Sequence, residues 1–508
     1  MSTETVPHTA MTLVDHLPAI QVLLPFVMAP LVVVVGSRRL AWPLTFLASA
    51  AAFVVSILLL MQVIDGSIIS YHMGGWAPPL GIEYRVDAAN AFVLLLVTAM
   101  STLVLLFARR SVEDEVSAKH HALFYTAFLL CLSGLLGVAI TGDAFNIFVF
   151  LEISSLATYV LIAQGSERDK RALTASYDYL MMGTIGATFF VIGIGFLYMA
   201  TGTLNLADIA GRIEDLGDNR TVRAGFAFIV VGIGLKVAMF PLHSWLPNAY
   251  TYAPSMVTAF LAATATKVAV YVLLRFVFSV FDPDFLFGTN TLAFIILPLA
   301  VVAMFSASFV AIFQSDLKRM LAYSSIAQIG YILLGIAFLS ETGVTAAIVH
   351  LFNHGITKAA LFMAVGAYVF SAKGTFYDTL QGMGRQMPLT SAAVVVGGLS
   401  LIGVPGTAGF ISKWVLVEAA LEKGWWPVAL LIVLSSLLAV IYVWRVLEVL
   451  YMQPASESST VREAPMSMVI PIWIGALACI YFGLDTDVTL TAARTAAQGL
   501  LAGSTGLH

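Results

Sequence analysis

Residues 224–250 read AGFAFIVVGIGLKVAMFPLHSWLPNAY, an apolar run that contains one lysine and two prolines. It is longer than the roughly 20 apolar residues that a membrane-spanning helix needs, yet Lys236 stands near its middle and Pro241 follows. Proline removes a helical hydrogen bond and kinks or breaks the helix. Irregular backbone at membrane depth survives only where protein or a water-filled cavity surrounds it. The stretch therefore predicts an interrupted helix inside a bundle of spanning helices.

The composition of the whole chain agrees with a membrane protein. Of its 508 residues, 60% are hydrophobic and 11% are charged, against about 25% charged in soluble domains. The mean hydropathy is +0.93. These values exclude a soluble enzyme, a nucleic-acid binder and a disordered scaffold, and the net charge of −4 indicates no polyanionic partner. Cys131 and Cys479 lie in apolar runs, where they are expected to be packing residues rather than part of a disulfide framework.

Apolar runs along the chain predict about fourteen spanning helices and an all-α integral membrane fold. A second long run, 391–422, contains Pro405 and is also expected to be interrupted. The two interrupted helices, the seventh and the twelfth, are five positions apart, which predicts two five-helix repeats of opposite orientation, as in many transporters. The expected units are the N-terminal helices in 1–120, the first repeat in 121–280, the second repeat in 292–450, and helix fourteen with the tail in 451–508.

Basic residues in the connecting segments predict the orientation in the membrane. Those that follow odd-numbered helices are Arg38, Arg39, Arg109, Arg110, Lys119, Arg168, Lys170, Arg171, Lys318, Arg319, Lys373, Arg385 and Arg462. Those in the other loops and the tail are fewer, namely Arg85, Arg212, Arg220, Arg223, Lys423 and Arg494. The positive-inside rule places the odd-numbered loops in the cytoplasm, and therefore both termini outside the cell membrane. The first 18 residues lack a basic segment, so no cleaved signal peptide is expected.

Five ionisable residues stand deep in apolar runs: Glu152, Lys236, Lys267, Lys358 and Lys413. Each costs at least about 2.5 kcal/mol at a helix centre. The alternative, that these are lysines whose ammonium groups reach the interface, applies to residues near helix ends. Four ammonium groups and one carboxylate cannot all be charged in a dry interior, so some lysines are expected to be neutral part of the time. Lysines poised in this way can accept and release protons.

Histidines add to this set. His350, His354 and Lys358 are spaced i, i+4, i+8 and share one helix face. His243 lies inside the break at Pro241, where it is either an accessory proton carrier or a cap for a freed carbonyl group. No carboxylate or thiol accompanies the histidines at ligand spacing, so a metal site is not expected. We also expect no bound cofactor, since the chain has no Walker loop, Rossmann fingerprint or cysteine cluster.

Five motifs resemble one known family, the antiporter-like subunits shared by respiratory complex I and Mrp-type multisubunit cation/proton antiporters. They are GDAFNIFVFLE (142–152), GLKVAMFPLHSWLP (234–247), DLKRMLAYSS (316–325), HLFNHGITK (350–358) and GVPGTAGFISK (403–413). The resemblance implies fourteen helices with inverted repeats of helices 4–8 and 9–13. It further implies that Glu152 and Lys236 control proton uptake, that Lys267 connects the halves, that His350, His354 and Lys358 form the central relay, and that Lys413 lies near the outward exit.

Two branches of that family fit best, the D-type subunits of Mrp-type antiporters and the N-like subunits of complex I. Lys413 disfavours the complex I subunit that has glutamate on helix twelve, and the short tail disfavours the longest members. The lead into Glu152, Gln328 and the 246–254 segment look more like the D-type branch. We therefore expect a secondary-transporter subunit that moves protons and, with its partner subunits, Na⁺. The alternative is a non-redox, proton-pumping subunit of complex I or of a related dehydrogenase or hydrogenase; a hydrophobic scaffold without transport is disfavoured by the buried charges.

Overall fold

The computed structural model describes residues 12–217, 219–281, 291–454 and 461–502. Helices dominate this part of the chain. The first half holds α1 (Leu17–Val35), α2 (Arg38–Val63), α3 (Ala88–Glu115), η2 (Ala118–His120), α4 (His121–Ile140), α5 (Ala144–Ala163), η3 (Gln164–Glu167), α6 (Arg171–Thr201), α7 (Leu206–Leu216), α8 (Arg220–Val237), α9 (Trp245–Tyr252), α10 (Ser255–Ala263), α11 (Ala265–Leu274) and η4 (Arg275–Val280).

The second half is equally helical. It holds α13 (Thr291–Ile312), α14 (Leu317–Ala337), α15 (Glu341–Ala372), α16 (Tyr377–Leu380), α17 (Met383–Gln386), α18 (Pro388–Ile402), α19 (Ala408–Glu422), α20 (Trp426–Leu447), η5 (Glu448–Met452), α21 (Met466–Leu484) and α22 (Asp487–Ala502). The all-α integral membrane fold expected from the sequence is confirmed.

Twelve helices in the described part are long and apolar enough to cross a membrane. The two interrupted pairs, α8 with α9 and α18 with α19, account for the two remaining crossings expected from the sequence. Both breaks occur at the predicted prolines. The first passes through Ala238, at a φ of 62°, and the second through Gly403, at a φ of 89°. Positive φ values end a right-handed helix, which is why the chain can leave the helical path at these two points.

Two loops far apart in the sequence share one hydrogen-bond pattern. Asp143 caps α5 by accepting from the Asn146 amide, and Asp316 caps α14 by accepting from the Arg319 amide. The residue after each aspartate then donates its amide to a distant strand-like segment: Ala144 to the Leu204 carbonyl and Leu317 to the Thr375 carbonyl, at 2.8 and 2.9 Å. The same local structure thus begins the fifth and the tenth spanning helix, which are five helices apart.

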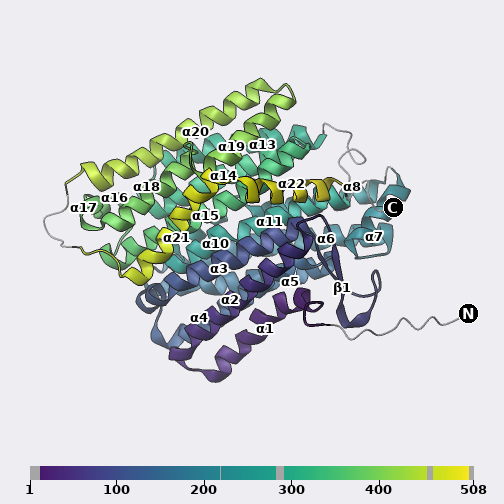
Figure 1. Cartoon of the computed structure of the whole chain (residues 1–508), viewed down its shortest axis with the longest axis horizontal. Helices are drawn as coiled ribbons and strands as arrows, with labels where there is room; N and C mark the ends of the chain where they lie inside the picture. Colours follow the sequence, from purple (N-terminus) through teal and green to yellow (C-terminus); the bar gives the residue numbers. More distant parts are fainter. Residues whose placement is uncertain (1–11, 218, 282–290, 455–460, 503–508) are drawn as a thin grey trace, which may run out of the picture.

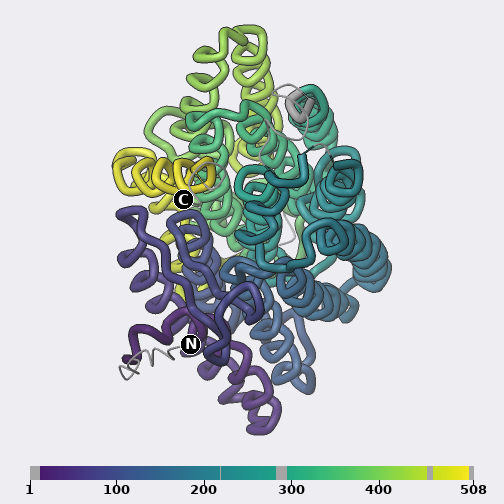
Figure 2. The backbone as a smooth tube through the Cα atoms, turned by 90° about the vertical axis from the view of Figure 1, so that its right-hand side faces the viewer, coloured from purple at the N-terminus to yellow at the C-terminus, as the bar shows by residue number. Residues whose placement is uncertain are grey.

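The helices form one bundle in which position follows sequence order as far as α20, whereas α21 and α22 return to pack on α3 and α15 (Figure 1). α1 and α2 lie at one end, α20 at the other, and α15 lies near the middle, packed against α10, α14 and α19. Figure 2 shows the same progression from the side, with the C-terminal helix, in yellow, on one flank of the bundle. α15 is buried along most of its length, so its polar side chains face protein rather than lipid.

Three elements had no counterpart in our expectations. Strands β1 (Ile69–His72) and β2 (Glu83–Val86) form an antiparallel hairpin that includes the short η1 helix (Met73–Gly75). The amphipathic helix α7 follows α6. α22 packs an alanine-rich face, which includes Ala492, Ala493 and Ala496, on α15, α3 and η4. These elements cover the ends of the spanning helices.

Candidate functional site

Glu152 and Lys236 meet inside the first half of the bundle. Glu152 projects from α5 and Lys236 from the last turn of α8, and the ammonium nitrogen lies 3.9 Å from a carboxylate oxygen. The Lys236 Nζ also donates to the Ser155 hydroxyl at 2.5 Å. The Lys236 side chain is 10% exposed and the Glu152 side chain is 28% exposed. At 3.9 Å the two charged groups form an ion pair without a direct hydrogen bond. The Ser155 hydroxyl can hold Lys236 when the carboxylate moves away.

Lys413 lies beside the second break. Its Nζ donates to the carbonyl oxygens of Leu401 and Ile402, at 3.1 and 2.8 Å. These carbonyls belong to the last turn of α18, where backbone acceptors have no helical partner because the helix stops. The negative end of the helix dipole favours a cation at this place. The break thus supplies a binding place for an ammonium group without any carboxylate.

Lys267 occupies a similar position at a third interruption, which was not predicted from the sequence. α10 and α11 are separated by Thr264, whose φ and ψ of −125° and −58° depart from the helical values. The Lys267 Nζ donates to the freed Ala262 carbonyl and, at 3.4 Å, to the Thr266 hydroxyl. Lys267 is 1% exposed, and no carboxylate lies within ion-pair distance of it in the described part of the chain.

Lys358, at the middle of α15, is fully buried. Its Nζ donates to the Leu321 carbonyl at 2.8 Å and to the Ser324 hydroxyl at 2.5 Å, both on α14. The ammonium group also lies 5.7 Å from the centre of the Phe362 ring. Like Lys267 and Lys413, it is held by neutral groups, here backbone and hydroxyl oxygens and an aromatic face.

Two histidines on α15 connect Lys358 toward Lys413. The rings of His350 and His354 are 6.1 Å apart and nearly parallel, at 14°. His350 bonds through Nδ1 to the Ser412 hydroxyl at 2.8 Å, next to Lys413. The Tyr331 ring lies between His350 and Lys413. Its centre is 5.6 Å from the centre of the His350 ring and 4.7 Å from the Lys413 Nζ. His350, Ser412, Tyr331 and Lys413 therefore form one polar cluster, and His354 stacks on His350 one turn along α15 toward Lys358.

Neither ring nitrogen of the buried His354 bonds to another protein group in the described residues, and the same holds for Nε2 of His350. Buried polar atoms are almost always hydrogen-bonded, so these nitrogens call for water partners. His243 lies apart from this cluster: it is half-buried in the α8–α9 break and its ring stacks on Phe240 at 5.2 Å. Whether His243 carries protons stays a prediction.

The described residues do not join the two halves by direct contacts. A cavity of about 10 Å³ beside Lys236 is also lined by Ala269 and Val272 of α11, the helix that carries Lys267. Such a space is about the smallest that can hold one water molecule, and its lining is apolar apart from Lys236. Proton transfer needs contacts of about 3 Å, so the step from Lys236 to Lys267 requires this space to widen and hydrate.

Four partners of the ionisable groups were not predicted from the sequence, although Ser324 and Ser412 lie within the motifs 316–325 and 403–413. Ser155, Ser324 and Ser412 are ordinary helix residues by sequence, since a serine hydroxyl on a helix more often bonds its own backbone, and Tyr331 is one of many aromatic residues in the apolar runs. Their role as partners of ionisable groups follows only from helix packing.

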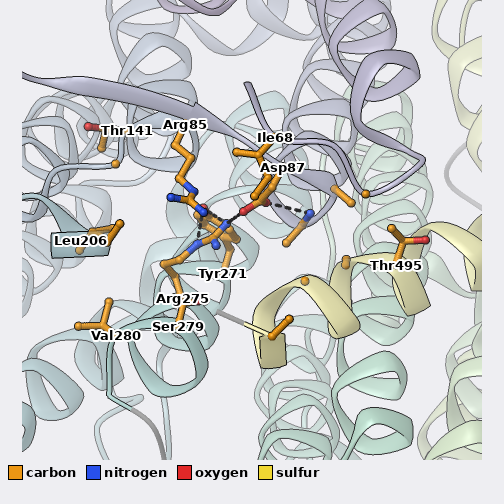
Figure 3. Close-up of a pocket in the computed structure, with 18 residues that line it drawn as sticks. Ile68, Arg85, Asp87, Thr141, Leu206, Tyr271, Arg275, Ser279, Val280 and Thr495 are labelled. Carbon is orange, nitrogen blue, oxygen red and sulfur yellow. Dashed lines mark hydrogen bonds and ion pairs between the residues drawn. The ribbon is translucent and has the colours of Figure 1, made fainter. Parts of the chain in front are cut away.

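A buried ion pair near the end of the eighth spanning helix was also missed. Arg275 donates to Asp87 at 2.6 Å and to the Tyr271 hydroxyl at 3.1 Å. The pair borders a cavity of about 200 Å³ between the hairpin, α7 and α22, into which Arg85 also extends (Figure 3). Asp87 and Arg275 are 15% and 10% exposed. From sequence, Arg275 is merely a residue near a helix end.

Known proteins are similar to this chain in both sequence and fold. Residues 141–439 match the family described as "NADH:quinone oxidoreductase/Mrp antiporter, TM". The chain is 38% identical over 494 residues to the "NADH-quinone oxidoreductase subunit N" of Desulforudis audaxviator, covering 93% of this chain and 96% of that protein. It is 30% identical over 488 residues to the "Putative antiporter subunit mnhD2" of Staphylococcus aureus, covering 94% and 96%.

A solved structure agrees. A chain in the Mrp complex from Dietzia sp. DQ12-45-1b superimposes with a TM-score of 0.88 at 25% identity, covering 97% of this chain and 98% of that one. So high a coverage takes in both halves of the bundle. This protein is a multi-pass, antiporter-like membrane subunit and belongs to the NADH:quinone oxidoreductase/Mrp antiporter family.

Proposed function

We propose that this chain translocates protons along the row Glu152, Lys236, Lys267, His350, His354, Lys358 and Lys413 within a multisubunit cation/proton antiporter. One observation carries the proposal: three lysines, Lys267, Lys358 and Lys413, are at most 6% exposed and are bound by carbonyl and hydroxyl oxygens instead of carboxylates. A permanently charged lysine without a carboxylate is costly in this environment, whereas one that exchanges protons is charged only part of the time.

The proposed cycle starts at the Glu152–Lys236 pair. When the pair opens, the Lys236 ammonium loses its counter-charge and a proton passes through water to Lys267. It continues through Lys358 and the histidines of α15 to Lys413, beside the second break. The two inverted five-helix repeats, 121–280 and 292–450, would each contribute one interrupted helix; the matching bonds at Ala144 and Leu317 support this division.

The family membership leaves two assemblies. We favour the Mrp-type antiporter with Na⁺ as the exported cation, in the cell membrane with both termini outside. The similarity to the Desulforudis audaxviator protein supports the alternative equally, an N-like pumping subunit of a respiratory complex. Under either assembly the partners are other membrane subunits.

The test is to purify the complex through a tag on this chain, identify the subunits that co-purify, and reconstitute it in proteoliposomes. Addition of NaCl should move protons, as reported by a pH-sensitive dye inside the vesicles. The variant Lys358→Met should lose this response, while the exposed Lys119→Met should keep it. Proton movement that requires a reductant and ignores Na⁺ would select the respiratory alternative. An unchanged response in Lys358→Met would refute the proton row.

A further inference from the structure

A second cavity, of about 440 Å³, opens on the face formed by the loops that follow odd-numbered spanning helices. Its walls come from the ends of α3, α9 and α15, the loop after η3, and the start of α14. The positive-inside bias predicts that this face lies in the cytoplasm. The proton row described above does not use the cavity.

Most cations around this cavity face a carboxylate. Arg168 pairs with Asp114, Lys373 pairs with the same Asp114 at 2.8 Å, and Arg171 pairs with Asp169 at 2.6 Å. These pairs are partly exposed, as expected for the rim of an aqueous opening.

Lys318 differs from these rim residues. It lines the cavity but is 5% exposed, and its Nζ donates to the Ala253 carbonyl at 2.5 Å. In the described part of the chain no carboxylate comes within ion-pair distance of it. The nearby Glu115 accepts instead from the amide and hydroxyl of Ser255, at 2.9 and 3.1 Å, and Asp316 accepts from Thr375 at 2.8 Å. Lys318 was expected to be a loop residue, and its burial at the start of α14 corrects that expectation.

The helix that carries Lys318 leads directly to the proton row. Leu321, one turn further along α14, offers its carbonyl to the Lys358 Nζ, and Ser324, after six residues, offers its hydroxyl to the same atom. Six residues of α-helix rise about 9 Å. Lys318 is thus held at the cavity by a carbonyl oxygen, as Lys358 is held deeper in the same helix interface.

We propose that Lys318 takes up protons from water in this cavity and passes them along α14 to Lys358. The inference rests on the proposed proton row and gives that row a second uptake point, on the cytoplasmic face of the second repeat, which each transport cycle requires together with the Glu152–Lys236 pair. In each transfer the neutral Lys318 amine accepts one proton from cavity water, and the resulting ammonium releases it through intervening water to the neutral amine of Lys358. Lys318 returns to the neutral form, so no charge accumulates.

Charged groups from all surrounding elements tune this exchange. They are Glu115 on α3, Arg168, Asp169 and Arg171 after η3, Asp316 and Arg319 at the start of α14, and Lys373 after α15. The acids favour uptake and the bases oppose it. High salt is therefore expected to change proton exchange at Lys318 less than at an exposed lysine, because salt screens the charges around a buried group less strongly.

The first experiment compares Lys318→Arg, Lys318→His and Lys318→Met in the reconstituted full complex. Arginine can still bond the Ala253 carbonyl but does not release its proton, so proton flux should fall at least about tenfold, and methionine should lower it as much. Histidine should keep partial flux, with its optimum at lower pH than wild type. Wild-type flux and pH profile in Lys318→Arg would show that Lys318 only anchors the α9–α10 loop, and would overturn the proposal.

The second experiment does not depend on transport. In a Cys131→Ser, Cys479→Ser background, Ser324→Cys is exposed to a small, charged thiol reagent added from the cavity face. The control is Ser308→Cys on α13, because both serines are 2% exposed or less and each bonds a carbonyl of its own helix. Ser324→Cys should react at least about tenfold faster, since only its position is reached by water from the cavity. Equal rates would overturn the uptake route even if Lys358→Met abolishes flux, whereas wild-type flux in Lys358→Met would refute the proton row itself.

Discussion

Replacing Glu152 by glutamine removes one charge and little volume. At 3.9 Å, and with an effective dielectric constant of about 20, the Glu152–Lys236 attraction is about 4 kcal/mol. The glutamate is 28% exposed, so solvent screening makes this an upper value. Even half of it changes the balance between charged and neutral Lys236 by more than about tenfold. Lys236 keeps its bond to Ser155 in Glu152→Gln, which favours normal insertion and assembly.

The assay is Na⁺-driven proton movement in proteoliposomes, together with subunit composition of the purified complex. Glu152→Gln should lose at least about nine-tenths of the flux while the complex stays intact. Glu113→Gln is the matched control, since Glu113 also faces a cation, Arg109, at 3.9 Å but lies at the surface. Surface pairs contribute roughly 0 to 1 kcal/mol, so the control should behave as wild type. Near-normal flux in an intact Glu152→Gln complex would contradict the switching role of this pair.

Three further predictions concern the breaks and the buried ion pair. Lys413→Glu should keep partial proton flux because a protonated carboxyl can still donate to the α18 carbonyls, whereas Lys413→Met should have none; equal flux in both variants would make Lys413 a packing residue. Arg275→Gln should destabilise the purified complex by about 3–5 kcal/mol because Asp87 stays buried without its partner, and adding Asp87→Asn should restore part of the melting temperature. Gly409→Ala should destabilise the purified complex by about 1–3 kcal/mol, since the new Cβ would lie 1.8 Å from the Ser400 carbonyl oxygen. Gly499→Ala, whose new Cβ would meet open space, is the control in thermal melting.

The helix count was predictable from the number of apolar runs. Two of the three interruptions were predictable because a proline stands inside each of those two runs. The third interruption, at Thr264, carries neither proline nor glycine. There the Thr264 hydroxyl bonds the Phe260 carbonyl at 2.7 Å, a local competition with the helix that many threonines make without breaking it. The hairpin, α7 and α22 were missed because short elements that rest on the bundle have no spanning-length signal.

The burial of these ionisable residues was predictable for a different reason: a charge inside an apolar run is costly, so it stands out in the sequence. Lys318 and Arg275 escaped because they stand near helix ends, where the sequence cannot distinguish a side chain that reaches water from one that packs inward. The structure separates these cases, since both side chains are buried in the bundle. Only packing between helices reveals such groups.

The interruptions and the lysines belong to one physical arrangement. Each interruption leaves backbone carbonyls without helical partners, and Lys267 and Lys413 bond those of α10 and α18. A carbonyl is neutral, so it attracts an ammonium group less strongly than a carboxylate does, yet it satisfies the group well enough to keep it inside the bundle. A lysine held in this way releases its proton at lower cost than one locked in an ion pair. Lys236 is the exception, with Glu152 at 3.9 Å, and this makes it the one lysine of the proposed row whose hold on a proton changes when an acid moves.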